Sequence, residues 1–146
     1  MMAISLKREL TYSFSKKSLL SCKILKLFLY ICNVNRKIVT YGGYFEAFME
    51  TLTEKEQTKI QYGLLLLKTQ DRLPKKFVKL IRDGIYELRT TWAGNIYRVF
   101  FIFDEGRIVV LFNGFQKKTQ KTPSSEIEKA IKIKEAYYAD KQSQDR

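Results

Sequence analysis

Histidine is absent from this chain of 146 residues, and only two cysteines occur in it, Cys22 and Cys32. The absence of histidine excludes a Ser-His-Asp or Cys-His nucleophile and a histidine acid–base pair. Since both cysteines lie before residue 34, a zinc site built from histidine or cysteine ligands in the rest of the chain is excluded as well. Any chemistry must therefore use arginine, lysine, tyrosine, carboxylates or the backbone.

Two cysteines are too few for a disulfide framework and indicate a reducing, intracellular compartment. Uninterrupted apolar stretches are also scarce. The stretch from Leu19 to Ile31 contains Lys23 and Lys26, which makes it too short and too charged to cross a bilayer. It fits a signal peptide badly, because a long polar region precedes it and no small-residue cleavage site follows. We therefore expect a cytoplasmic protein without a membrane partner.

Positive charge is what the chain has in excess, with 27 basic and 15 acidic residues and a net charge of +12. Residues 35–146 hold 21 of the basic and 14 of the acidic residues, so the surplus is not confined to the first segment. Between Arg72 and Lys121 there are 11 basic and 4 acidic residues. This surplus favours an anionic partner, most simply nucleic acid, with a basic surface that has no specific partner as the alternative.

The length suits one domain with its own core. Residues 1–34 are dominated by serine, lysine and leucine. We expect them to be an extension that is poorly structured, above all over residues 1–18, or that results from a start assigned too far upstream. A basic amphipathic surface segment is the alternative. Residues 35–140 are expected to form the domain and residues 141–146 a polar tail.

The residue pattern predicts the order β-α-α-β-β-β-α. Thr53 and Glu56 form a capping box that opens the second helix. Short apolar strands separated by glycine-bearing turns are typical of a meander. Thr122 and Pro123 are expected as N-cap and first residue of the last helix. The strands are predicted at Arg36–Tyr41, Ile85–Trp92, Ile96–Phe103 and Arg107–Phe115, the helices at Tyr44–Leu52, Glu54–Gln70 and from Pro123 to about Ala139, and a connection at Asp71–Asp83.

These elements predict an α+β domain with a small, mostly antiparallel sheet of about four strands. We expect the helices to pack on one face of this sheet and to leave the other face free for function.

The predicted strands carry cations in or just beyond apolar stretches, at Arg89, Arg98, Lys117 and Lys118. A cation in such a place needs a partner or an open face. Strand alternation puts Arg89 on one face with Glu87. An ion pair of Glu87 with either arginine, without a functional role, is the alternative. Whether Arg98 lies on that face depends on the turn. Pairing of Trp92 with Ile96 would separate the two arginines, and a slip of one residue would bring them together.

Four segments resemble the phage-derived HigB branch of the RelE/ParE toxin superfamily: Gly84–Arg89, Tyr97–Phe101, Leu111–Pro123 and Glu126–Ala130. The resemblance extends from about Lys37 to Tyr138, and the run from Gly114 to Pro123 is its most specific part. It implies a fold like that of RelE and the small microbial ribonucleases. It also implies the toxin half of a type II toxin–antitoxin pair, which cleaves mRNA on the ribosome and inhibits translation. The implied partner is a HigA-like helix-turn-helix antitoxin.

The resemblance further implies that Arg89, Arg98, Lys117 and Lys118 line the RNA face as catalytic residues. Many relatives carry a histidine where this chain has Asn113, so a contribution of that position to proton transfer stays open.

RNA cleavage of this kind needs no metal or cofactor, because the 2′-hydroxyl of the substrate is the nucleophile. Arg98 offers a fixed pair of donors for phosphate oxygens, and Arg89 could do the same or be braced by Glu87. A lysine crowded by other cations can act as a weak base, and Lys118 or Lys117 is the candidate.

Other residues are expected to bind the RNA around the cut. Lys75, Lys76, Lys79 and Lys121 could follow the phosphate backbone. Tyr97 and Phe115 could each stack a base, with packing in the core as the alternative. Two other functions remain open: a ParE-like inhibitor of DNA gyrase with the same fold, and a non-catalytic, basic nucleic-acid-binding remnant of a phage protein.

Overall fold

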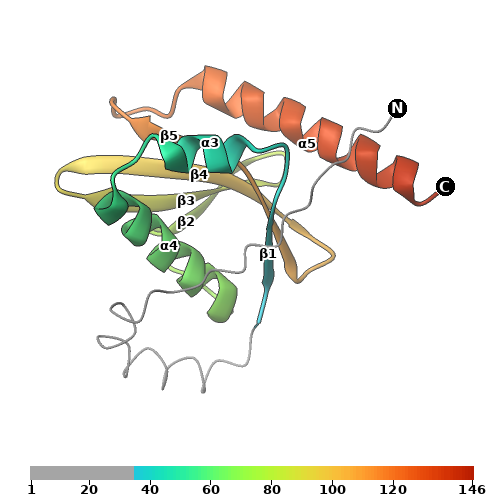
Figure 1. The fold of residues 1–146 in the computed structure, drawn as a ribbon, viewed down its shortest axis with the longest axis horizontal. Coiled ribbons are helices and arrows are strands. Elements are labelled where there is room, and N and C mark those ends of the chain that lie inside the picture. The colour runs from blue at the N-terminus through green and yellow to red at the C-terminus, as the bar shows by residue number, and fades with distance from the viewer. Residues whose placement is uncertain (1–34) are drawn as a thin grey trace.

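The structure is a computed structural model that describes residues 35–146, so the predicted extension over residues 1–34 lies outside the described residues. Figure 1 shows the fold. No helix in the described part of the chain combines the length and the apolar character that a membrane span requires. The elements are β1 (Lys37–Thr40), α3 (Tyr44–Glu50), α4 (Glu54–Thr69), β2 (Val78–Arg82), β3 (Ile85–Trp92), β4 (Asn95–Asp104), β5 (Ile108–Lys117) and α5 (Ser124–Gln144).

The sheet has five strands in the order β1-β5-β4-β3-β2, so the predicted number of about four was one too low. β1 pairs with β5 in parallel, and the other pairs are antiparallel. The additional strand is β2, which lies within the predicted connection and pairs Val78 with Leu88. Its sequence, Val-Lys-Leu-Ile-Arg, mixes apolar residues with exposed cations because it forms the outer edge of the sheet.

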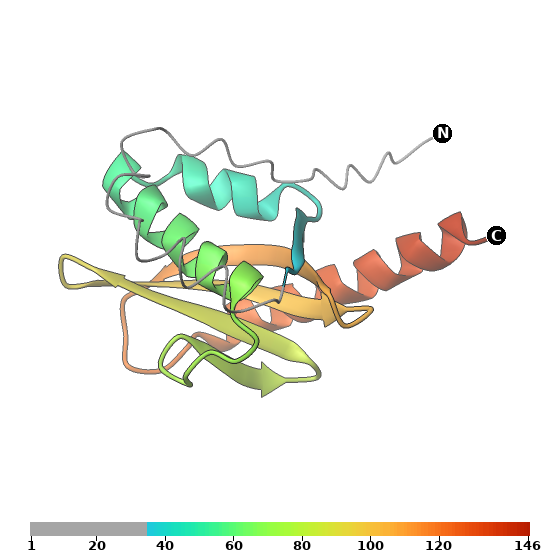
Figure 2. The same cartoon turned by 90° about the horizontal axis from the view of Figure 1, so that it is seen from below.

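Helices cover both faces of the sheet, and the prediction that they pack on one face only was wrong. α3 and α4 pack on the face that carries Val99 and Phe101. α5 packs on the opposite face, against Phe100 and Ile102. Figure 2 shows the sheet between these two layers. The reason is that successive residues of β4 are apolar and point to opposite faces, so both faces must be buried.

The first two helices begin as the sequence indicates. The Glu56 backbone N–H donates to the Thr53 hydroxyl at 3.4 Å, and the Thr53 backbone N–H donates to the Glu56 carboxylate at 2.7 Å, which completes the capping box. The other end of α4 is capped by the guanidinium of Arg36. It donates to the carbonyls of Leu67 at 2.7 Å and Gln70 at 2.6 Å, which fixes β1 to the end of this helix.

The last helix differs from its prediction at both ends. Pro123 is the N-cap, not the first helical residue, and no side chain caps the helix. The helix reaches Gln144 instead of about Ala139, so residues 141–144 are helical. Lys141 explains the longer helix, because its ammonium group binds the carboxylates of Asp104 at 2.8 Å and Glu105 at 2.6 Å.

A β-bulge in β5 shapes the face under α5. Val99 pairs with Gly114, whereas Phe101 pairs with Leu111. Two residues of β5, Phe112 and Asn113, therefore lie opposite the single residue of β4 between these pairs. Beyond the bulge Gly114 faces α3, since a Cβ built on it would lie 2.2 Å from the Phe48 ring. The residues that follow, Phe115 and Lys117, are on the pleat that faces away from α3.

Candidate functional site

Arg89 and Arg98 are directly opposite each other on neighbouring strands and thus lie on one face. The turn pairs Trp92 with Asn95, not with Ile96, and this decides the question that the sequence left open. In the next strand Phe115 is opposite Arg98. This row across three strands lies on the face that α5 covers, beyond the N-terminus of that helix.

Glu87 holds the two arginines together. Its side chain is fully buried, with 0% exposed, and its Oε1 lies 2.8 Å from Nε of Arg89 and 3.1 Å from Nε of Arg98. The Thr122 hydroxyl donates to the other carboxylate oxygen at 3.2 Å. Thr122 therefore ties the β5–α5 connection to the ion pair instead of capping α5. The cluster contains two cations and one anion, so it keeps one positive charge.

The two arginines differ in exposure. The side chain of Arg98 is 8% exposed and that of Arg89 is 28% exposed. Burial lowers the pKa of Arg98 from its usual value; Glu87 opposes this shift and Arg89 adds to it. A guanidinium stays protonated through such a shift, so Arg98 remains a cation.

The directional hydrogen bonds of Arg98 are weak. Within residues 35–146 its Nε has no hydrogen-bond partner of good geometry despite the nearby carboxylate, and one terminal nitrogen reaches the Tyr97 carbonyl only at 3.5 Å. Charge, more than directed donors, thus holds the guanidinium in place. This leaves donor capacity for an anionic ligand such as a phosphate.

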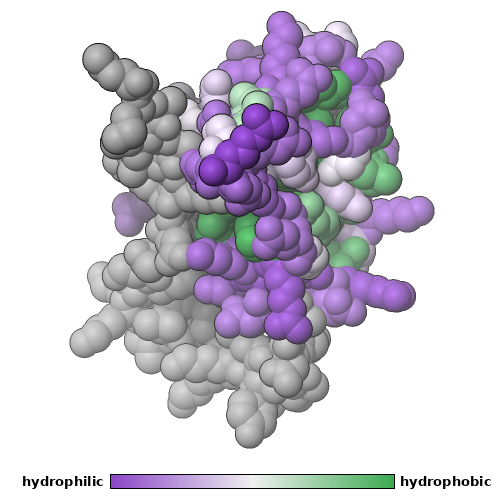
Figure 3. Space-filling model, turned by 90° about the vertical axis from the view of Figure 1, so that its right-hand side faces the viewer, coloured by the Kyte–Doolittle hydropathy of each residue, from purple (hydrophilic) through white to green (hydrophobic). Residues whose placement is uncertain are grey.

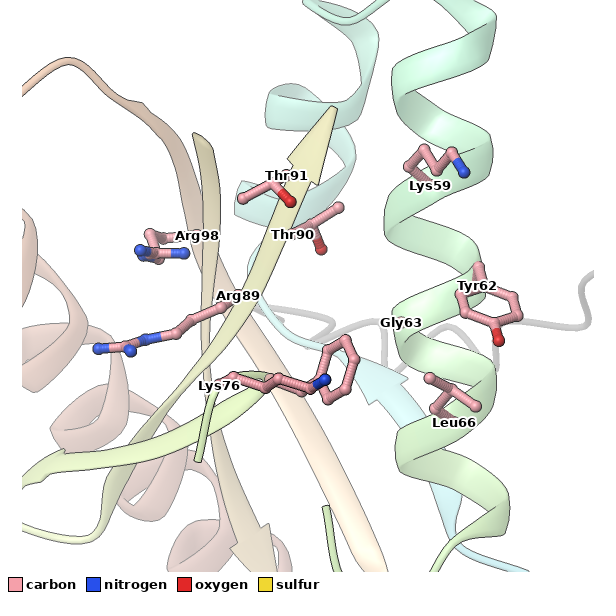
Figure 4. Close-up of a pocket in the computed structure, with 10 residues that line it drawn as sticks. Lys59, Tyr62, Gly63, Leu66, Lys76, Arg89, Thr90, Thr91 and Arg98 are labelled. Atoms are coloured by element: carbon pink, nitrogen blue, oxygen red, sulfur yellow. The ribbon is translucent and has the colours of Figure 1, made fainter. Parts of the chain in front are cut away.

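Two cavities meet at Arg98. The first, of about 620 Å³, brings Arg98 together with Lys117 and Lys118 at the end of the β3–β4 hairpin. The second, of about 530 Å³, lies between β3 and α4 and is lined by Arg89 and Arg98 with Lys76. Figure 4 shows that the side chains of Arg89 and Arg98 extend away from α4, to the other side of β3. All four predicted catalytic residues therefore line one or both of these cavities.

This arrangement can bind an anion and stabilise negative charge that develops on it. Residues 35–146 contain no group of three or more histidine, cysteine, aspartate or glutamate side chains that could hold a metal ion.

A family model matches the part of the chain that forms this site. Residues 47–135, which include the arginines, Glu87 and both lysines, match the family described as "Phage derived protein Gp49-like (DUF891)". The chain belongs to this Gp49-like family. The family is toxin-like and of the RelE type, and it places the chain in the context of a toxin with an antitoxin partner. No curated protein matches the chain.

The lysines that were predicted to bind RNA are exposed in the Gp49-like chain, but they lie in different places. Lys79 lies opposite Glu87 in the antiparallel register of β2 with β3, which puts it on the face of the arginines. Lys76 lines the cavity beside α4, and its Nζ lies 5.0 Å from the centre of the Phe77 ring. Lys75 and Lys121 are exposed and line neither of the two cavities.

The two predicted stacking residues have different outcomes. Tyr97 is 0% exposed on the face of α3 and α4, and its hydroxyl donates to the Glu56 carboxylate. The prediction that Tyr97 stacks a base was therefore wrong, because no base can reach its ring. Phe115 is half-buried and packs against Phe100 with ring centres 5.4 Å apart. It stays a candidate on the row of Arg98.

Asn113 is buried at the bulge. Its Nδ2 donates to the Glu126 carboxylate at 2.9 Å and to the Glu126 carbonyl at 3.2 Å. Its Oδ1 has no hydrogen-bond partner among the described residues. In this chain the residue thus connects the bulge to the first turn of α5, and a neutral amide cannot transfer protons in the way a histidine can.

Sequence reasoning missed residues on α4. Lys59 and Tyr62 line the cavity next to the arginines, and neither was among the predicted site residues. The available signal was their spacing of three residues, which places a cation and an aromatic ring on one helix face. The sequence does not show that this face lies beside β3.

Proposed function

We propose that this Gp49-like chain is the toxin of a type II toxin–antitoxin system and acts as a ribosome-dependent mRNA endoribonuclease that inhibits translation. The observation that carries the proposal is the buried Glu87, which holds Arg89 and Arg98 on one face at the edge of cavities that also contain Lys117 and Lys118. The toxin-like family supports an antitoxin partner. The proposal adds that this partner is a HigA-like helix-turn-helix protein and that the target is mRNA on the ribosome in the cytoplasm.

The proposed reaction uses the RNA's own 2′-hydroxyl. Its oxygen attacks the adjacent phosphorus, the bond from phosphorus to the 5′-oxygen breaks, and the products are a 2′,3′-cyclic phosphate and a 5′-hydroxyl. Arg98, braced by Glu87, and the more exposed Arg89 stabilise the additional charge on the phosphorane. Lys117 and Lys118 are the candidates for taking the proton from the 2′-hydroxyl and supplying one to the leaving oxygen.

The proposal is tested by inducing the full chain in bacteria and following growth and new mRNA 5′ ends. The variants are Arg98→Ala and, because Arg98 is buried, the charge-preserving Arg98→Lys. The control is Arg107→Ala, which removes the same charge from an exposed turn at the other end of the sheet. The level of folded protein is measured for each variant.

Growth arrest with new ends inside reading frames, lost in Arg98→Ala and kept in Arg107→Ala, supports the proposal. Arrest without new ends would contradict it and point to another target, such as DNA gyrase. Absence of arrest with folded wild-type protein would also contradict it.

A further inference from the structure

The cavity beside α4 continues the arginine site around an uncovered edge of β3. β2 pairs with β3 from Ile85 to Leu88, and the last contact on this side is the Arg89 backbone N–H, which donates to the Phe77 carbonyl at 2.7 Å. Within the described residues, no strand pairs with the outer edge of the following residues, Thr90 to Trp92. A chain of small cross-section could therefore pass from the arginine face to the α4 face at this point.

Aromatic rings and cations alternate along this route. Lys59 lies over the Trp92 ring with its Nζ 4.7 Å from the ring centre, and Lys76 lies in the same way over Phe77. Tyr62 stands between them on α4 and is 47% exposed, which makes it one of the most exposed large hydrophobic residues in the described chain. Such alternation is typical of surfaces that bind single-stranded nucleic acid.

The charge of the lining selects an anion. Every charged residue that lines the cavity is a cation: Lys59 and Lys76, and also Arg89 and Arg98, whose side chains extend to the other side of β3. No carboxylate of the described chain lines it, unlike the arginine cluster itself, where Glu87 balances one charge. A volume of about 530 Å³ is within the range of small-ligand sites, which suits a nucleotide and excludes a duplex.

We propose that this cavity is a second RNA subsite, in which one unpaired base next to the scissile phosphate stacks on Tyr62 while Lys59 and Lys76 contact the adjoining phosphates. The proposal rests on the proposed function and makes it more specific. The substrate is single-stranded on at least one side of the cut, and it bends around the edge of β3 between the two cavities.

The test compares Tyr62→Ala with Tyr62→Phe, which keeps the stacking ring. Both changes suit an exposed helix position, since alanine is the best helix former. Tyr44→Ala is the matched control, because Tyr44 is similarly exposed at 39% and also carries a lysine, with Nζ of Lys129 5.5 Å from its ring centre. Tyr44 lines neither of the two cavities.

The substrate is mRNA on purified ribosomes, in one series intact and in a second series with a single abasic nucleotide at each position around the cut. We expect Tyr62→Ala to raise KM about tenfold with little change in kcat, in keeping with the loss of one stacked base. Tyr62→Phe and Tyr44→Ala should stay within about twofold of wild type. At one abasic position, the KM of the wild type should rise by the same factor as the KM of Tyr62→Ala rises with intact mRNA. The same abasic position should leave the KM of Tyr62→Ala unchanged, because removing the second of two direct partners causes no further loss in a double-mutant cycle.

Unchanged KM in Tyr62→Ala would overturn the subsite. The subsite would also be overturned if the effects of Tyr62→Ala and of an abasic nucleotide on KM were additive at every position. Tyr62 would then contact something other than the substrate, such as ribosomal RNA or an acidic segment of a protein partner.

The second readout separates this inference from the proposed function. Binding of fluorescent 2′-O-methyl oligoribonucleotides, which cannot be cleaved through the 2′-oxygen, is measured with the same variants. If the wild type cuts no RNA, the proposed function fails, and the subsite is then decided by binding alone. Weaker binding by Tyr62→Ala that one abasic position reproduces supports the subsite, and equal binding by all variants overturns it.

Discussion

A carboxylate is buried at each end of the sheet face under α5, but the cations around it are arranged differently at the two ends. At one end Glu87 is enclosed by Arg89, Arg98 and Thr122. At the other end Asp104 accepts from the Tyr137 hydroxyl at 2.6 Å and from Lys141 at 2.8 Å. Both carboxylates lie on central strands, where an unpaired charge would be costly.

The Asp104 end is closed by the last turns of α5. Tyr41 donates to Asp140 at 2.6 Å beside it, and the Tyr41 and Tyr137 rings pack edge to face with centres 5.3 Å apart. Burial, followed by the bond to Asp104, raises the pKa of Tyr137. Figure 3 shows the side of the molecule at which α5 ends, where the described residues present a mostly hydrophilic surface with smaller apolar patches.

Among the described residues, α5 does not cover the Glu87 end in this way, because it begins at Ser124 and extends away from the arginines. A buried carboxylate on a strand thus holds a helix in place at one end of this sheet face and holds partly exposed cations at the other end. If the proposed function holds, a buried charge in this fold marks the functional site only where its counter-charges reach a cavity. The following changes test this distinction.

Glu87→Gln should have the largest effect, because it leaves two arginines without their buried anion. We expect a loss of about 3–5 kcal/mol of stability together with loss of RNA cleavage. Urea denaturation and cleavage per folded molecule measure the two effects. A change in stability below about 1 kcal/mol would show that Glu87 does not hold the arginines.

Arg89→Ala should separate function from stability at the same end. Its side chain is partly exposed, so the loss of stability should be at most about 1 kcal/mol. Cleavage should fall about 10²- to 10³-fold, since a donor to the developing charge is lost. Arg107→Ala is the control and should cleave like wild type; equal loss in both variants would mean that only the overall charge matters.

Asp104→Asn is the counterpart of the glutamate change at the closed end. The amide disturbs the bonds from Tyr137 and Lys141, so we expect a loss of about 1–3 kcal/mol of stability. Cleavage per folded molecule should not change, in contrast to Glu87→Gln. Reduced cleavage by fully folded Asp104→Asn would remove the distinction between the two ends.

The smallest effect concerns alkaline pH at the closed end. Burial and the bond to Asp140 raise the pKa of Tyr41 from 10.0 to about 12. Since the folded-state pKa lies above the unfolded value, this stabilisation is present below pH 10 and is lost as the pH rises towards 12. Melting temperatures from pH 8 to about 12 should fall less steeply for Tyr41→Phe than for wild type. Parallel curves would contradict the assignment.

Much of the fold could be predicted from the sequence. The strand Ile85–Trp92, the capping box at Thr53 and the order of the long elements are confirmed, because turns and caps are coded by neighbouring residues. β2 was missed because its cations hide the alternation of an edge strand. The position of α5 was predicted wrongly because a strand that is apolar on both faces does not show which helix covers which face.

The candidate site was predictable in its residue types but not in its arrangement. The cations stand out in apolar strands of the sequence. Whether the two arginines lie on one face depends on a single pairing at the turn, Trp92 with Asn95. The burial of Tyr97 depends on where α4 lies, and the two stabilising groups Thr122 and Asn113 depend on a loop and a bulge. These are contacts between residues far apart in the sequence, which local patterns do not encode.

Cleavage of ribosome-bound mRNA with a single 2′-deoxynucleotide at the cut tests whether the arginine cluster cleaves RNA through the substrate's 2′-hydroxyl. We predict that wild-type protein cuts the all-ribose mRNA to a 2′,3′-cyclic phosphate and a 5′-hydroxyl, and that the deoxynucleotide blocks this cut alone. Equal cleavage of both substrates would rule out this mechanism, because the nucleophile would then come from elsewhere.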